Sequence, residues 1–102
     1  MKNLGLIIKQ LHELAVFLHE CDKNQWAKYL EELIILGENK SYDEFENRVH
    51  NLFRGMGSLI DLSLYIEGNR ERTDALNNKL SSMTHALYEL AYNQPDDNQV
   101  GV

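Results

Sequence analysis

The 102-residue sequence predicts an all-α protein, folded as a compact bundle of four to five helices. Through most of the chain, apolar residues recur at steps of three and four, which is the period of one buried helix face. Short polar or glycine-containing segments separate these stretches, as turns between packed helices do. With 43% hydrophobic and 25% charged residues, the composition is that of a folded globular domain. We therefore expect one helical domain over residues 1–94 and a flexible acidic tail over residues 95–102.

The first two helices are predicted from their apolar stripes. The first runs from Leu4 to Cys21, with charged and polar residues off the stripe. The polar turn over residues 22–24 follows, and Asp22 or Asn24 is expected to cap the next helix. The second helix is predicted from about Gln25 to Leu36, and Gly37 is expected to stop it.

The third helix has the clearest predicted start. Ser41-Tyr42-Asp43-Glu44 matches a capping box, in which the Ser41 hydroxyl and the Glu44 carboxylate each accept a hydrogen bond from a backbone amide. Two acidic residues in the first turn also complement the positive end of the helix dipole. The helix is expected to end near Arg54, where a turn containing Gly55 and Gly57 leads to a short fourth helix.

The stretch over residues 58–66 fits two structures. Some of its apolar residues fall on one helical face, whereas Ile60, Leu62, Leu64 and Ile66 alternate as in a strand. No second strand is evident in the sequence, and a lone strand would leave its backbone groups unpaired. A short helix is therefore favoured, with the extended alternative left open.

The last helix shows the sharpest periodicity of the chain. It is predicted to open near Thr73 or Asp74, to reach Tyr92 and to end before Pro95. Its apolar residues alternate in steps of four and three, a spacing that suits antiparallel packing in a bundle or a homodimer seam. The residues of this seam are Leu76, Leu80, Met83, Leu87 and Leu90.

The net charge bears on the kind of partner, and the cysteine content and the lack of long apolar segments bear on the location of the protein. The net charge of −6 argues against nucleic acid and favours a basic protein, because nucleic-acid binding relies on Lys and Arg. The single cysteine, Cys21, forms no intramolecular disulfide, which suits a reducing compartment. No signal-peptide core or membrane span is evident, so a cytoplasmic protein without a membrane partner is expected.

No motif in the sequence indicates catalysis, a metal or a cofactor. His12 and His19 lie seven residues apart on a helix, about 10 Å along its axis, which is too far for both to bind one metal easily. Gly55 to Ser58 resembles a phosphate-binding loop only superficially, because it lacks the P-loop lysine and follows a helix. A rival hypothesis is a small helical enzyme or ligand-binding bundle with a site at this turn. Its residues would be Asp61, Ser58, His50 and Arg54.

Acidic residues cluster around the second and third helices and are the best candidates for a partner-binding surface, although most such clusters are simply solvated. The candidates are Glu31, Glu32, Glu38, Asp43 and Glu46, together with Asp61. Trp26, Tyr29 and Tyr42 are candidate anchors if they are exposed, but core positions are favoured for them.

The second half of the chain resembles a family of small bacterial proteins of unknown function. The resemblance rests on the turn from Gly55 to Ser58 and on the later Leu87-Tyr88-Glu89-Leu90-Ala91 segment. It implies a compact helical bacterial protein, similar in size and acidity to immunity proteins that neutralise toxins, and it implies no catalytic residues. The expected function is therefore that of a non-enzymatic immunity-type protein, which binds a basic toxin domain and needs no cofactor.

Overall fold

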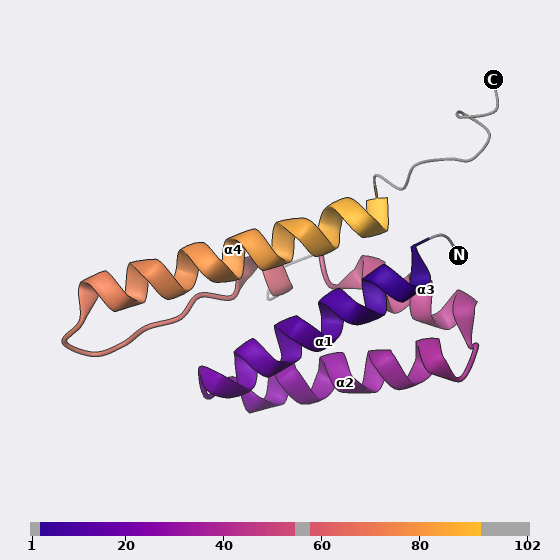
Figure 1. The fold of residues 1–102 in the computed structure, drawn as a ribbon, viewed down its shortest axis with the longest axis horizontal. Coiled ribbons are helices and arrows are strands. Elements are labelled where there is room, and N and C mark those ends of the chain that lie inside the picture. Colours follow the sequence, from indigo (N-terminus) through magenta and orange to yellow (C-terminus); the bar gives the residue numbers. More distant parts are fainter. Residues whose placement is uncertain (1–2, 55–57, 93–102) are drawn as a thin grey trace, which may run out of the picture.

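The computed structural model describes residues 3–54 and 58–92. These ranges form four α-helices, α1 (Leu4–Glu20), α2 (Asn24–Glu38), α3 (Tyr42–Asn51) and α4 (Arg70–Tyr92), and one 3₁₀ turn, η1 (Leu59–Asp61). They contain no β-strand, so the predicted all-α bundle is confirmed (Figure 1). Residues 55–57 of the predicted glycine turn and the predicted tail over 95–102 lie outside the described ranges.

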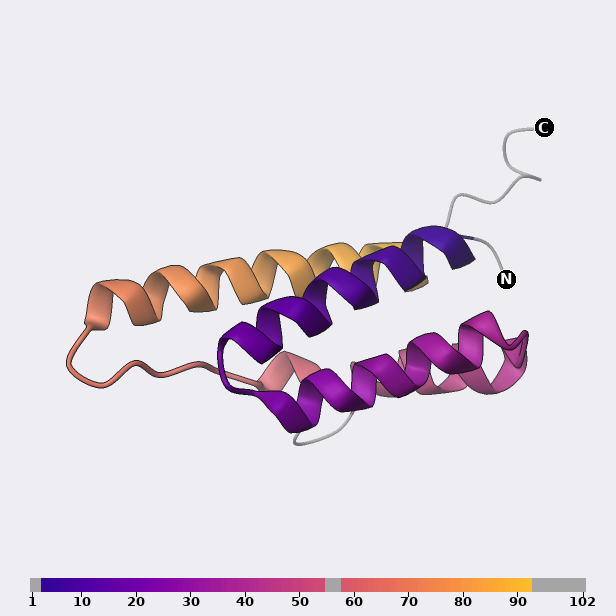
Figure 2. The same cartoon turned by 60° about the horizontal axis from the view of Figure 1, so that its bottom comes forward.

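α1 and α2 pack against each other, and each of them also packs against one further helix. α1 and α2 form an antiparallel hairpin, α4 lies along the other side of α1, and α3 folds back against α2 (Figures 1 and 2). η1 contacts α4. In both views, the first half of α4 and the segment leading into it extend beyond the ends of α1 and α2.

The core lies where these helices meet, and the predicted apolar stripes supply it. Its largest fully buried side chains are Phe45, Ile7, Leu11, Leu14, Leu18, Leu30, Leu33, Leu59, Leu87 and Val49. Within the described ranges, no helix is both long enough and apolar enough to cross a bilayer.

Gly37 does not stop the second helix, which continues to Glu38. Gly37 is buried, and a Cβ atom there would lie 3.0 Å from Cε1 of Phe45 and 3.1 Å from Cδ1 of Ile8. The glycine therefore lets a side chain of α3 and one of α1 approach the backbone of α2 closely. Close packing of the helices, and not helix termination, therefore explains why residue 37 is a glycine.

The side-chain capping hydrogen bonds predicted for α2 and α3 are not formed. Ser41 is the N-cap residue of α3, but its side chain makes no capping hydrogen bond, and its ψ of 64° differs from the extended geometry that usually aims a cap. The Glu44 carboxylate instead accepts a hydrogen bond from Arg48 at 2.9 Å. Lys23 is the N-cap residue of α2 and also makes no side-chain cap, while Asn24 bonds to α1.

The stretch over residues 58–66 combines the two predicted alternatives, a short helix and an extended segment. Only η1 is helical, and the chain from Leu62 to Ile66 forms neither helix nor strand. α4 takes the place of the missing second strand, because the Asn77 side chain bonds both backbone groups of Leu64. The amide of Ile66 donates to Thr73 Oγ1 at 2.9 Å.

α4 begins at Arg70, earlier than the predicted start at Thr73 or Asp74. The side chain of Asn69 accepts a hydrogen bond from the amide of Arg72 at 2.9 Å, which is the geometry of a helix cap. The helix reaches Tyr92, as predicted. The polar residues 69–72 fit either a loop or a frayed first turn by sequence, because they carry no apolar periodicity, and the structure has residues 70–72 in the first turn of the helix.

The leucine seam of α4 faces the protein's own core. Leu80 and Leu87 are buried, and Leu76, Met83 and Leu90 are partly buried against the core cluster. A homodimer through this seam would therefore have to share side chains that already pack within the chain.

Candidate functional site

The three candidate glutamates of α2 lie on its exposed side. Glu31, Glu32 and Glu38 are all exposed, and the buried side of the helix points toward α1 and α3. Ile35 lies among them, three residues from both Glu32 and Glu38, and the residue is 54% exposed. Residues three or four apart are neighbours on a helix surface. We call Glu31, Glu32, Ile35 and Glu38 the acidic face.

The candidates on α3 extend this negative charge. Asp43 is exposed and Glu46 is partly exposed. Asp43 lies just across the turn from Glu38, since residues 39–41 alone separate α2 from α3. Asp43 also stabilises α3, because a carboxylate in the first turn of a helix interacts favourably with the helix dipole.

Asp61, the sixth candidate, belongs to a different part of the fold. It is exposed at the end of η1, which packs against α4. The structure therefore brings five of the six predicted acidic residues onto the neighbouring helices α2 and α3, and it leaves Asp61 beside the extended segment.

Glu31 is partly engaged within the chain, through His19. The two ring nitrogens of His19 face Asn24 Oδ1 at 2.8 Å and Glu31 Oε1 at 3.4 Å. Because both neighbours accept hydrogen bonds, the doubly protonated ring fits best, and the pKa of His19 is raised, first by Asn24 and then by Glu31. Among the described residues, Glu32, Glu38 and Asp43 have no such partner.

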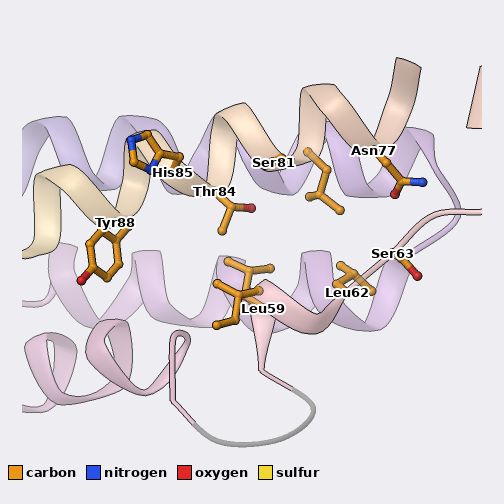
Figure 3. A pocket seen from close by; sticks show the side chains of 10 residues that line it. Leu59, Leu62, Ser63, Asn77, Ser81, Thr84, His85 and Tyr88 are labelled. Carbon is orange, nitrogen blue, oxygen red and sulfur yellow. The ribbon is translucent and has the colours of Figure 1, made fainter. Parts of the chain in front are cut away.

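A groove of about 380 Å³ separates η1 and the following residues from α4 (Figure 3). Leu59 and Leu62 line one side, and Asn77, Thr84 and Tyr88 are among the residues on the other. The hydroxyl of Thr84 is buried, with 6% of the residue exposed, and has no hydrogen-bond partner in the described structure. None of the residues that line the groove is a Lys, Arg, Asp or Glu.

The residues proposed for a small-enzyme site do not share one pocket in the described structure. Arg54 and Ser58 line a shallow pocket with Trp26 and Tyr29, whereas His50 and Asp61 do not line it. His50 instead stacks on Tyr92 at the end of α4, with ring centroids 4.5 Å apart. Gly55 and Gly57 lie outside the described residues.

Two further kinds of reactive site were considered within the described residues, a metal site and a reactive cysteine. Across the described ranges, no three His, Cys, Asp or Glu side chains are grouped so that they could hold a metal ion. Burial raises the pKa of the Cys21 thiol, which opposes formation of the reactive thiolate.

The predicted aromatic anchors have different environments. Trp26 and Tyr29 pack edge to face at 6.1 Å and are partly buried against the core, whereas Tyr42 is 38% exposed. Sequence reasoning missed Ile35 as a surface residue. The available signal was its position off the stripe formed by Leu30, Leu33 and Gly37.

A second set of aromatic residues was also missed, at the end where α3 and α4 meet. Phe53 packs against Tyr88 with ring centroids 5.4 Å apart, and Tyr88 stacks on Tyr92 at 4.6 Å. The four-residue spacing of the two tyrosines was the available sequence signal. This cluster holds the end of α3 against α4.

In comparisons with models of protein families, with curated proteins and with solved structures, the chain has no match.

Proposed function

We propose that this chain is a non-enzymatic, cytoplasmic protein of the immunity type, which binds and neutralises a basic toxin domain. The observation that supports this proposal best is the acidic face of α2. There the exposed Ile35 lies between Glu32 and Glu38, which have no ion-pair partner among the described residues. Protein interfaces commonly combine a desolvated apolar anchor with a polar rim.

In this proposal, the carboxylates mainly speed association, by attracting the basic partner before the two proteins touch. With a net charge of −6, the protein attracts a cationic surface, and Glu32 and Glu38 orient that surface toward Ile35. Ile35 then becomes buried against the partner. Glu38 is the last residue of α2, where the helix dipole disfavours a carboxylate, so its charge is not explained by helix stability.

The proposal is tested by co-purification of the tagged protein with the products of the neighbouring genes, followed by measurement of association rates. With a captured partner, E32Q/E38Q should lower the association rate about tenfold at low salt, and the effect should shrink as salt is added. E13Q/E20Q is a matched control, because it removes the same charge from exposed residues of α1 and Glu20 is also the last residue of its helix. The control should have a much smaller effect.

The anchor is tested separately. I35A should weaken binding about tenfold or more, mainly through faster dissociation, because a buried apolar contact is lost. L6A is the matched control, since Leu6 of α1 is equally exposed at 54%. If no neighbouring product binds, or if each variant and its control lose equal affinity, the proposed function is wrong.

A further inference from the structure

One wall of the groove between η1 and α4 is a single face of α4. The residues that line the groove from this helix recur at alternating steps of three and one, so they lie along one side of about three helical turns. They are Asn77, Leu80, Ser81, Thr84, His85 and Tyr88. The groove volume of about 380 Å³ lies within the range of small-molecule sites, roughly 300–1,000 Å³.

The groove is apolar and buried at its base and becomes polar toward its exposed rim. Leu59 and Leu80 are buried, whereas Ser63, Ser81 and His85 are exposed. Among the described residues that line the groove, there is no Lys, Arg, Asp or Glu. A charged ligand would therefore lose hydration on entering without gaining an opposite charge. The walls favour an uncharged molecule.

Thr84 is the one polar residue of the groove that is buried. Its hydroxyl has no hydrogen-bond partner among the described residues, and its side chain projects from α4 toward Leu59 (Figure 3). A buried hydroxyl without a partner costs free energy, which a ligand that bonds to it recovers. The oxygen atom itself is covered, so the side chain has to rotate about its Cα–Cβ bond to present it. Threonine populates two such rotamers in helices.

From these observations we propose that the groove binds an uncharged, mainly apolar small molecule that carries one hydroxyl or carbonyl group. The apolar body packs against Leu59 and Leu80, and the oxygen of the ligand bonds to the hydroxyl of Thr84. Walls without acidic residues suit the Lys and Arg side chains of a basic protein poorly. The groove is therefore a site separate from the acidic face of α2, and its ligand is independent of the proposed toxin partner.

The test titrates benzyl alcohol into ¹⁵N-labelled full-length protein and compares it with three molecules of similar size. Ethylbenzene has a methyl group in place of the hydroxyl, benzylammonium has a cationic group there, and benzoate is an anion. Benzyl alcohol should give saturable amide shifts concentrated at residues 59–63 and 77–88, with a Kd in the millimolar range. Both charged molecules should bind about tenfold more weakly or worse, although the net charge of −6 attracts the cation.

The role of Thr84 is tested by T84V, which removes the hydroxyl and keeps the β-branched shape. T84V should weaken binding of benzyl alcohol about three- to tenfold and leave binding of ethylbenzene within about twofold of the parent. T84S keeps a hydroxyl at this position, so it should retain the parent's preference between the two molecules. If T84V changes the binding of both molecules equally, or of neither, the assignment to Thr84 is overturned.

The location of the site is tested by S81F. Ser81 is exposed on the groove wall, so a phenylalanine there should fill the groove and abolish binding of benzyl alcohol. S82F is the matched control, because Ser82 is the exposed next residue of α4 and does not line the groove. It should bind like the parent.

The proposal is overturned if benzyl alcohol shifts no amide of the groove at concentrations up to about 20 mM. It is also overturned if S81F and S82F bind equally well, or if benzylammonium binds as tightly as the alcohol. Because these titrations contain no partner protein and leave Glu32, Ile35 and Glu38 unchanged, each such failure leaves the proposed function of the acidic face standing.

Discussion

Asn77 of α4 bonds both the amide and the carbonyl of Leu64, at 2.7 and 2.9 Å. One side-chain amide thereby replaces the two backbone groups that a neighbouring strand would supply. This pair explains how an extended segment persists in a protein whose described part has no sheet.

N77A should lower the free energy of unfolding by about 1–3 kcal/mol, because it leaves two partly buried backbone groups of Leu64 unpaired. Chemical denaturation measures the change. Asn78 is its exposed neighbour on the same helix, so N78A is the control and should change stability by less than about 0.5 kcal/mol. Equal losses in the two variants would mean that Asn77 acts only through helix propensity.

G37A should destabilise the protein by about 1–3 kcal/mol. The added methyl group would lie 3.0 Å from the Phe45 ring and 3.1 Å from Ile8, so the packed side chains of two other helices would have to move. G5A should have the opposite effect, since no atom of a packed neighbour lies within 4 Å of its added Cβ. It should stabilise the protein by about 0.5–1 kcal/mol through helix propensity. In thermal melts, G37A should therefore have a lower melting temperature than the parent protein, and G5A a higher one.

T84V should raise the melting temperature, because it removes a buried hydroxyl that has no hydrogen-bond partner and keeps the β-branched shape. The expected gain is up to about 1 kcal/mol. T73V is the matched control on the same helix. It should lower stability, because Thr73 Oγ1 accepts the hydrogen bond from the Ile66 amide. A loss of stability in T84V would show that its hydroxyl has a partner in solution.

The free energy of unfolding should depend on the protonation of His19. Its pKa is raised above the ordinary 6.5 in the folded state, chiefly by Asn24 and then by Glu31. The resulting stabilisation is full below pH 6.5 and is lost as the pH rises through the higher folded-state pKa. Denaturation midpoints measured between about pH 5.5 and 8.5 should therefore show an advantage of the parent over H19Q that shrinks with rising pH. N24A should reduce this dependence, and an unchanged dependence in N24A would contradict the assignment.

Local residue patterns predicted the helices themselves. The three- and four-residue spacing in the first 50 residues and again up to Tyr92 was enough for an all-α bundle, because a helix face repeats within a few residues of sequence. The same patterns placed five of the six candidate carboxylates on α2 and α3. The capping interactions were predicted less well than the helices, since Ser41 is the N-cap residue of α3 but forms no side-chain cap, and Asn24 bonds to His19 instead.

Other features of the fold were decided by contacts between segments distant in sequence. Gly37 is explained by Phe45 and Ile8, which approach it only when three helices pack together. The segment around Leu64 is extended because Asn77, 13 residues later, satisfies its backbone, and no pattern within residues 58–66 contains that partner. The sequence by itself therefore determined which stretches are helical, and tertiary packing decided how the segment around Leu64 is held and which apolar side chains stayed exposed.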